Sequence, residues 1–373
     1  MSNIATPHAA LYSHRAVALW LFIVAGCVAG LVLLGGLTRL MGAGLSITEW
    51  QPVIGIIPPL SLADWEIAFQ KYQTIAEYRL VNSDMSLAEF KIIYWWEWAH
   101  RLMGRAIGLI FLVPFLWFLW RKHIPARFIA PLCVLFALGG LQGFIGWYMV
   151  QSGLEADRIN VSQYRLAVHL GLALIIFGMS LWLALRLWHK DKKQGDKLPA
   201  HQFYFAFVLL GLIFLQCLAG ALVAGLEAGK TYTDWPFMDG QFIPSGLFAM
   251  SPLIVNFFEN ILTVQWQHRI IAYLLFGLAI WHYWQQTRST SARSAPAESN
   301  VASNSAAWLA LAICGQAILG IATVMGAQAI LGIATVMGAV PLILAVLHQF
   351  GALLVLTIAI YHLYRLRIAC NIE

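Results

Sequence analysis

The sequence predicts an all-α membrane protein with eight transmembrane helices, arranged as two repeat-related four-helix bundles. Of its 373 residues, 60% are hydrophobic and only 11% are charged, and the mean hydropathy is +0.73. Soluble domains carry about 25% charged residues. Apolar runs recur along the chain at lengths near the ~20 residues that cross a bilayer as a helix. Polar motifs recur in both halves of the chain, which predicts the two bundles.

Eight runs with few or no charges mark the expected helices: 16–38, 106–120, 128–150, 166–185, 202–226, 270–284, 306–339 and 340–364. The second and sixth runs are too short to cross ~30 Å of hydrocarbon. We therefore expect these two helices to begin further upstream. That extension brings polar side chains into the membrane, namely Glu97, Trp98, His100, Arg101 and Arg105 in the second helix and Gln265, Trp266, His268 and Arg269 in the sixth. Buried ionisable groups of this kind mark function or a satisfied interior pair.

Charge indicates topology and argues against a nucleic-acid partner. The formal net charge is +6, but Lys and Arg are spread among the loops without a long basic run. They are nearly twice as frequent in the two termini and the loops after the second, fourth and sixth helices as in the opposite loops. The positive-inside rule then places both termini in the cytoplasm. The long segments 41–93 and 227–260 are expected outside, in the periplasm of a bacterium whose inner membrane holds the chain.

The two halves repeat each other in sequence. The residues Gly44, Thr48, Glu49 and Trp50 recur at a constant offset of about 185 positions as Gly229, Thr233, Asp234 and Trp235. Trp98, His100 and Arg101 recur as Trp266, His268 and Arg269, and His169 recurs as His348. We expect an N-terminal bundle at 1–190 and a C-terminal bundle at 191–373. An even number of helices separates equivalent elements, so the halves share one membrane orientation.

A second repeat is local. The twelve residues 316–327 (QAILGIATVMGA) are followed at once by an identical copy at 328–339. A straight helix over the whole of 306–339 would be ~51 Å long, well beyond the hydrocarbon core. The helix must tilt, bend at a glycine pair or extrude part of one copy. An inessential insertion is favoured over a functional element.

Four histidines indicate a metal-binding function. His100, His169, His268 and His348 each stand several residues inside the outer end of helices two, four, six and eight, which run in the same direction. A single intramembrane histidine is more often a hydrogen-bonded interior group, but two repeat-related pairs favour ligation. Zinc and di-iron sites need three or more Cys, His or carboxylate ligands, and none completes such a set at this depth. Haem iron needs only two axial imidazoles.

Two charged side chains beside these histidines have open interpretations. Arg101 and Arg269 directly follow His100 and His268, where a guanidinium could pair with haem propionates or extend outward to water. Glu97 lies one helical turn before His100, whereas Gln265 takes the same place before His268. This asymmetry favours a reactive first site with a catalytic Glu97 and a passive second one. The alternative is a structural ion pair between Glu97 and Arg101, four residues apart.

A competing pattern involves two further histidines. His282 and His362 each stand fourteen residues after His268 and His348, a spacing of ~21 Å that would stack a second haem in one half. Both lie among aromatic residues near the expected inner interface, and helices two and four lack the partner residues. Interfacial histidines are the preferred interpretation.

At these residues the sequence resembles the haem A synthase family, in its proteobacterial and mitochondrial branch. The matching segments include GGLTRLMGAGLSITEWQPVIGIIPPL, EWAHRLMGRAIGL, VSQYRLAVHLGLAL, VQWQHRIIAYLL and VPLILAVLHQFGALL. They are distributed over most of the chain. The other branch has a cysteine pair in the first outer segment, and residues 41–93 contain no cysteine. The twelve-residue duplication is foreign to the family pattern.

The resemblance implies that a ring methyl of haem O is oxidised to the formyl group of haem A for use in cytochrome oxidase. It implies that His100 and His169 flank the substrate haem O, that His268 and His348 ligate the iron of haem b, and that Glu97 is the acidic catalytic residue. The family chemistry is drawn as successive hydroxylations followed by loss of water. An electron donor and haem O synthase are the expected partners; the oligomeric state is not predicted.

Two rival functions use the same features. A membrane b-type cytochrome would carry electrons between haems and make no product, but the Glu97/Gln265 asymmetry argues against it. A transporter would suit repeated halves, yet the polar groups lie near one surface rather than at the midplane.

Overall fold

The computed structural model describes residues 7–155, 157–189, 198–291, 297–332 and 340–372. Within these ranges the dominant elements are eight helices of 26 residues or more. They are α1 (Pro7–Leu40), α4 (Leu87–Trp120), α5 (Ala126–Gly153), α6 (Gln163–Trp188), α7 (Ala200–Gly225), α9 (Ile261–Ser291), α10 (Ala297–Gly332) and α11 (Val340–Ala369). The all-α prediction is confirmed.

Seven of these helices are long and apolar enough to cross a membrane, so the chain has the build of a multi-pass membrane protein. The exception among the eight is α9. Its apolar run at 270–284 is short and rich in Trp and Tyr, and polar residues flank it on both sides. Composition therefore supports seven of the eight expected spans.

The upstream extension expected for two helices is confirmed. The helix that holds the 106–120 run begins at Leu87, and the helix that holds 270–284 begins at Ile261. The start of α4 is fixed by a capping box, in which Ser86 accepts from the Glu89 amide while the Glu89 carboxylate accepts from the Ser86 amide. The motifs EWAHR and QWQHR are consequently helical.

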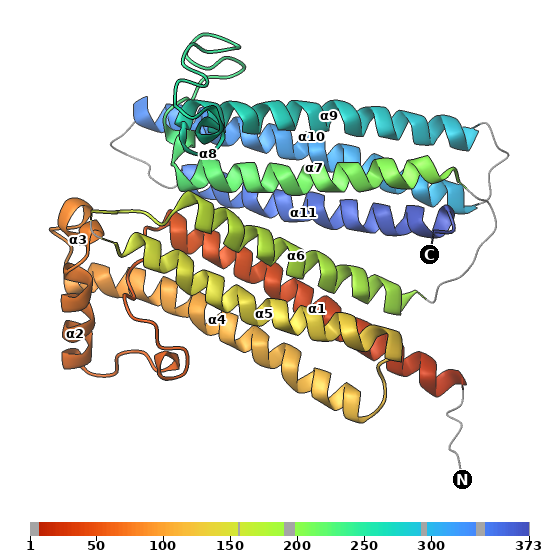
Figure 1. Ribbon diagram of the computed structural model, residues 1–373, viewed down its shortest axis with the longest axis horizontal. Helices are drawn as coiled ribbons and strands as arrows, with labels where there is room; N and C mark the ends of the chain where they lie inside the picture. Colours follow the sequence, from red (N-terminus) through yellow and green to blue (C-terminus); the bar gives the residue numbers. More distant parts are fainter. Residues whose placement is uncertain (1–6, 156, 190–197, 292–296, 333–339, 373) are drawn as a thin grey trace.

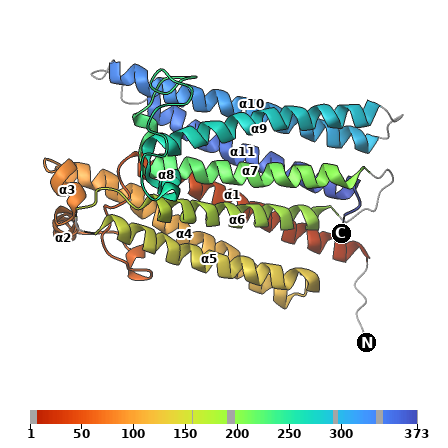
Figure 2. The ribbon, with the colours of Figure 1, turned by 45° about the horizontal axis from the view of Figure 1, so that its top comes forward.

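The helices pack in two groups joined along a seam. In one group α1 contacts α4 and α6, and α5 contacts α4 and α6; in the other, α7 contacts α9 and α11, and α10 contacts α9 and α11. The seam is made by α6 against α7 and α11, with α1 beside α11 (Figures 1 and 2). A single apolar core extends across this seam, with fully buried residues from both groups such as Leu21, Leu132, Leu209 and Tyr364.

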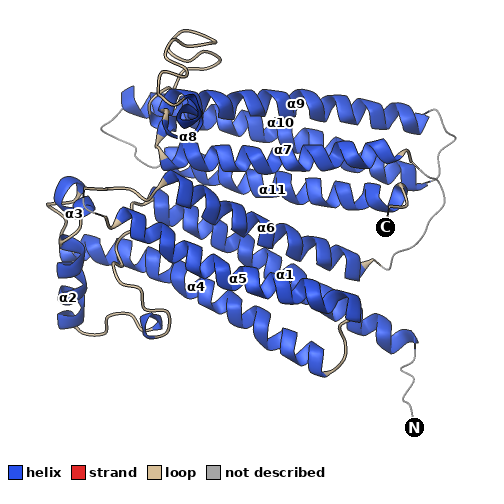
Figure 3. Cartoon of the chain, in the orientation of Figure 1, coloured by secondary structure: helices blue, strands red, loops and turns tan. Residues whose placement is uncertain are grey.

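The two ends of the bundle differ. Long connections gather at one end, where α2 (Leu62–Gln73), α3 (Ala76–Val81) and α8 (Asn256–Glu259) lie with much of the irregular chain (Figure 3). Three short helices of 3₁₀ type, Ile54–Ile56, Ala228–Lys230 and Leu253–Val255, belong to the same connections. A separate apolar cluster, which includes Trp65 and Tyr72 of α2 and Phe90 of α4, packs α2 onto α4.

The local duplication falls partly outside the described residues. The helix α10 contains all of the first copy, 316–327, and ends at Gly332 inside the second copy; residues 333–339 are not described. Contacts to α11 come from the first copy: Gly326 passes Leu344 so closely that an added Cβ would be 3.0 Å from Leu344 Cδ1, and Thr323 Oγ1 is 3.4 Å from the Leu344 carbonyl oxygen. The first copy therefore supplies contacts that pack α10 against α11.

Deletion of residues 328–339 is expected to leave the fold intact. Because the copies are identical, the remaining one keeps its junctions both to Gly315 and to Val340. Since the remaining copy keeps the contacts to α11, the free energy of unfolding should change by on the order of 1 kcal/mol or less. Size-exclusion chromatography and thermal unfolding in detergent measure this. As a control, deletion of 301–312 removes buried Ala302 and Leu309 and should prevent folding. An aggregated 328–339 deletion would contradict the prediction.

Candidate functional site

The four predicted histidines share one local environment. Each ring packs edge-on against a glycine of the neighbouring helix, so that a Cβ added to the glycine would be about 3 Å from the ring Cε1 atom. The four glycine–histidine pairs, with that separation, are Gly35–His100 (2.8 Å), Gly146–His169 (2.9 Å), Gly220–His268 (3.2 Å) and Gly320–His348 (3.0 Å). Real Cβ atoms essentially never approach closer than 3.0 Å. Each glycine therefore makes room for one imidazole.

The rings fall into two pairs, one in each helix group. His100 on α4 lies within electrostatic reach of His169 on α6, and His268 on α9 lies within reach of His348 on α11. Among the described residues, no three His, Cys, Asp or Glu side chains are grouped closely enough to hold a metal ion by themselves. Two imidazoles per site suit a metal that brings its own equatorial ligands, as haem iron does.

Glu97 is one of the most constrained polar side chains of the described chain. It is 3% exposed. Its Oε1 accepts from Arg101 Nη2 at 2.6 Å and Nε at 3.1 Å, and its Oε2 accepts from Ser46 Oγ at 2.7 Å and the Ile47 amide at 2.8 Å. The ion pair that the sequence allowed as the structural interpretation therefore exists. Four hydrogen bonds fix the carboxylate at one turn from His100, which is equally what a positioned catalytic group needs.

Arg101 and Arg269 both tie an outer segment to the bundle. Arg101 donates to the Ile47 carbonyl at 2.7 Å and the Glu49 carbonyl at 3.0 Å. Arg269 donates to the Tyr232 carbonyl at 3.0 Å and the Asp234 carbonyl at 2.8 Å, positions 185 residues further on. The sequence repeat thus recurs as a repeat of contacts. Neither open alternative, propionate pairing or a purely outward extension, included these carbonyls; a role of the two arginines in cofactor binding stays a prediction.

The repeat breaks at Glu97. Gln265 occupies the equivalent place, is 2% exposed, and donates through Nε2 to the Tyr232 carbonyl at 2.7 Å. Its Oε1 has no partner in the part of the chain that the structure describes. The first site therefore holds a carboxylate with four donors, and the second holds an amide with one acceptor.

His282 and His362 do not form a second haem site. Their Nε2 atoms are hydrogen-bonded at 2.8 Å, and Ser305 Oγ lies 2.8 Å from His362 Nδ1. A porphyrin cannot lie between rings in direct contact. The two rings are 1% and 0% exposed, so both are enclosed by protein; their location at the depth of the inner interface stays a prediction.

Three functional candidates were missed by the sequence analysis. Gln142, Gln216 and Gln316 each contact one of the histidines across a helix pair. The available signal was a glutamine four residues before a glycine, repeated on three helices, which puts both on one helix face. Ser46, which donates to Glu97, had no recognisable signal.

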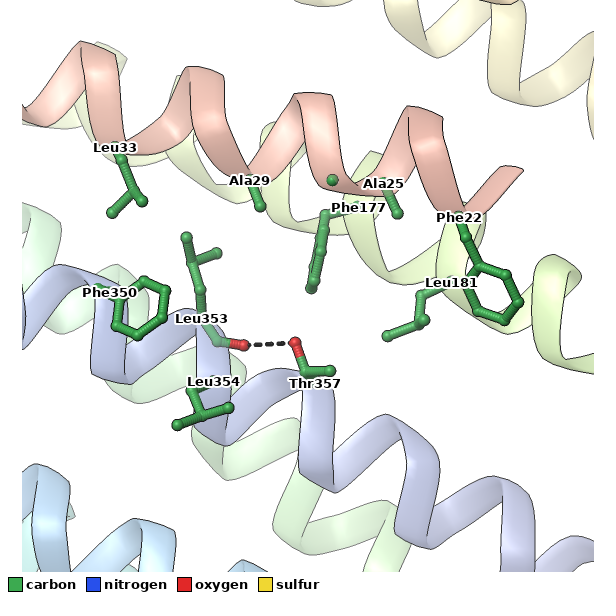
Figure 4. Close-up of a pocket in the computed structure, with 11 residues that line it drawn as sticks. Phe22, Ala25, Ala29, Leu33, Phe177, Leu181, Phe350, Leu353, Leu354 and Thr357 are labelled. Atoms are coloured by element: carbon green, nitrogen blue, oxygen red, sulfur yellow. Dashed lines mark hydrogen bonds between the residues drawn. The ribbon is translucent and has the colours of Figure 1, made fainter. Parts of the chain in front are cut away.

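An apolar cavity of about 230 Å³ lies on the seam between α1, α6 and α11. Its lining includes Phe22, Phe177 and Phe350. The hydroxyl of Thr357, which also lines the cavity, donates to the Leu353 carbonyl at 2.7 Å (Figure 4). No histidine lines it. Its lining is apolar apart from this hydroxyl.

These features define a class: a helical, multi-pass membrane protein with paired, half-buried imidazoles between its helices. A sequence model of the COX15-CtaA family, described as cytochrome oxidase assembly proteins, matches residues 18–327. The haem A synthase of Parvibaculum lavamentivorans is 48% identical over 354 residues, 95% of both chains. Those of Bradyrhizobium sp. (strain ORS 278) and Nitrosomonas eutropha are 47% and 43% identical and cover 94% of this chain and 91% and 93% of their own. The chain belongs to the haem A synthase family, as its motifs indicated.

A pH effect on stability is expected from the outer carboxyl Glu77 on α3. Burial, and then repulsion from Glu97, raise its pKa to about 7. A raised pKa in the folded state gives stability that is present below the unfolded pKa of about 4.5 and is lost as the pH rises through 7. Glu77→Gln should therefore unfold like the parent at pH 5 and be more stable at pH 8, by on the order of 1 kcal/mol. Tryptophan fluorescence during thermal unfolding reports it through nearby Trp65.

The exposed Glu66 on α2 provides the matched control. Glu66→Gln should track the parent protein at both pH values. Equal behaviour of the Glu77 and Glu66 variants at pH 8 would show that the burial of Glu77 has no energetic consequence.

Proposed function

We propose that this chain is a haem A synthase, an enzyme that oxidises a ring methyl of haem O to the formyl group of haem A for cytochrome oxidase. The observation that carries the proposal is the pair of half-buried imidazoles in each helix group, every ring seated against a glycine, in a chain 43–48% identical to haem A synthases over nearly its full length. The assignment makes the chain a membrane oxidoreductase.

The two pairs are assigned different haems. His100 and His169 hold the substrate haem O, and His268 and His348 hold the iron of a resident haem b. Support comes from the donor set: neutral imidazoles, two per site, with unpartnered ring nitrogens buried at His100 Nδ1 and His268 Nδ1. The glycine gaps give the imidazoles fixed positions. Arg101 and Arg269, near the outer end, are assigned to the cofactor surroundings as well.

Glu97 is the proposed catalytic carboxylate. When bound, haem b supplies one-electron redox chemistry. The oxidant and the oxygen atom of the formyl group would come from outside the chain. The imidazoles would orient the substrate, and Glu97 would take up a proton at a carboxylate oxygen once one of its four hydrogen bonds gives way. Ser46, Ile47 and Arg101 hold that carboxylate in place. Gln265 cannot accept a proton in the same way, so the second site is passive.

The proposed architecture is eight crossing helices in two four-helix bundles, residues 1–190 with the substrate site and residues 191–373 with the haem b site. The repeated arginine contacts to the outer segments support it. Both termini are assigned to the cytoplasm and the haem sites to the periplasmic side of a bacterial inner membrane, on the distribution of Lys and Arg. The enzyme that makes haem O and an electron donor are the proposed partners.

An electron-carrying cytochrome b is the alternative. It would need the same four histidines but no carboxylate beside one pair only. Pigment extraction after co-expression with a source of haem O separates the two: a synthase accumulates haem A, and a carrier retains b-type haem alone.

Glu97→Gln, which copies Gln265 into the first site, is expected to keep haem binding and lower the haem A yield at least roughly 100-fold, the usual contribution of a positioned acid–base group. Chromatography of extracted haems measures the yield, and the absorption spectrum of the purified protein measures total haem. The reverse change, Gln265→Glu, alters the second site only and should retain haem A synthesis.

Wild-type haem A yield from the Glu97→Gln protein at normal haem content would remove the catalytic role of the carboxylate. Loss of all haem from that variant would instead assign Glu97 to the structural ion pair with Arg101.

Gly146→Ala is expected to displace the His169 ring and weaken haem binding in the N-terminal pair, because the new methyl would lie 2.9 Å from Cε1. Gly143→Ala on the same helix adds a methyl with nothing within 4 Å, so haem content should be unchanged and the helix stabilised by up to about 1 kcal/mol. Haem titration of both proteins tests this. Equal haem affinities would show that the glycine gap does not position His169.

A further inference from the structure

A glutamine accompanies three of the four histidine rings. Gln142, Gln216 and Gln316 each stand four residues before the glycine that seats a ring, and so lie on the same helix face one turn away. On α1 the equivalent position, four residues before Gly35, is Leu31. Leu31 packs toward α4, 3.9 Å from a Cβ built on Gly104. On α1 the position that the three glutamines occupy on their helices is therefore held by a hydrocarbon side chain.

The three amides make the same two contacts. Each Nε2 donates to the main-chain carbonyl of a histidine and also lies within hydrogen-bond distance of a nitrogen of its ring. The distances to the carbonyl and to the ring are 3.0 and 3.2 Å for Gln142–His169, 3.0 and 3.3 Å for Gln216–His268, and 2.8 and 3.0 Å for Gln316–His348. One repeated device thus links ring, ligand helix and neighbouring helix.

The other atom of each amide is unsatisfied. The Oε1 atoms of Gln142, Gln216 and Gln316 are all buried with no hydrogen-bond partner among the described residues. Buried polar atoms are nearly always paired in a working protein. Each orphan oxygen belongs to an amide whose nitrogen lies 3.0–3.3 Å from a ring nitrogen, Nδ1 in His169 and His348 and Nε2 in His268. Three such acceptors, one turn from a ring-seating glycine, indicate a state of the site in which an N–H points at them.

A ligating imidazole provides that N–H. When one ring nitrogen binds iron, the other keeps its proton and needs an acceptor, which fixes the ring and strengthens it as a donor. A rotation of the imidazole toward Oε1 makes this bond while Nε2 keeps its bond to the histidine carbonyl. We propose that Gln142, Gln216 and Gln316 are positioning residues that accept the ring N–H of His169, His268 and His348, and that Leu31 leaves His100 the one exchangeable ligand.

The consequence is an asymmetry in haem retention, and this deepens the proposed function. Both histidines of the C-terminal pair have an amide partner, so that site keeps its haem. The N-terminal pair has one partner, at His169. Its other ligand, His100, dissociates from the iron more readily, so substrate can enter and product can leave.

Gln349 shows what a merely structural glutamine looks like here. Its Nε2 donates to the Val32 carbonyl at 2.8 Å and bridges α11 to α1, without a hydrogen bond to a histidine ring. Gln349→Leu therefore removes one amide–carbonyl bond between helices and leaves every ring as it is. It is the matched control for the three positioning residues.

The test measures how fast haem transfers from the purified full-length protein to an excess of apomyoglobin. His100→Ala protein reports on the C-terminal site and His268→Ala protein on the N-terminal site. In the first background, Gln216→Leu should speed haem loss roughly 10–100-fold, the usual cost of removing such a partner, and should raise the reduction potential. In the second, Gln142→Leu should do the same. In otherwise unchanged protein, Leu31→Gln should slow transfer from the N-terminal site.

Gln349→Leu should match its parent in both rate and potential. The proposal is overturned if the histidine-facing variants and Gln349→Leu change transfer equally, or if none changes it and the potentials stay constant. The proposed function fails separately: protein that holds haem at both sites with the expected rates but makes no haem A refutes the synthase and leaves the positioning role intact.

Discussion

The close approach of a glycine to an imidazole is the contact on which the rest of the site depends. In hydrocarbon, a histidine ring must be enclosed by protein and offered polar partners. The gaps at Gly35, Gly146, Gly220 and Gly320 enclose one ring each, and every gap joins a different helix pair. The pairing of α1 with α4, α5 with α6, α7 with α9 and α10 with α11 is thereby tied to ligand position. A substitution that pushes one pair apart moves a ring.

The outer segments depend on a second repeated contact, and there the two halves have diverged. Arg101 and Arg269 use the same geometry to hold main-chain carbonyls 185 residues apart. Beside these shared contacts, Glu97 accepts hydrogen bonds from Ser46 and Ile47, whereas Gln265 donates to the Tyr232 carbonyl. A carboxylate cannot be buried without such donors. The outer segment that Arg101 anchors thus also supplies the donors that allow the Glu97 carboxylate to be buried beside His100.

The sequence predicted two kinds of feature: helices that follow from the length of apolar runs, and polar side chains whose burial in a membrane is costly. The upstream start of α4 followed from the shortness of the 106–120 run, and the four histidines followed from their expense in a bilayer. The sequence could not predict contacts between distant segments. Nothing in the pattern joins Ser46 to Glu97, and the aromatic residues around His282 and His362 do not indicate that these two rings bond to each other. The spacing from Gln216 to Gly220 was visible, but only the contact with His268 gives it meaning.

The low apolarity of α9 has a physical counterpart in these contacts. A helix crosses a bilayer when its polar groups are satisfied within the protein, whatever its average hydropathy. On α9, His268 faces Gly220 and Gln216, and His282 is bonded to His362, itself held by Ser305. The helix contacts α7 on one side and α10 on another. Several of its polar side chains therefore make hydrogen bonds inside the bundle, and the polar residues that lower its hydropathy include His268 itself.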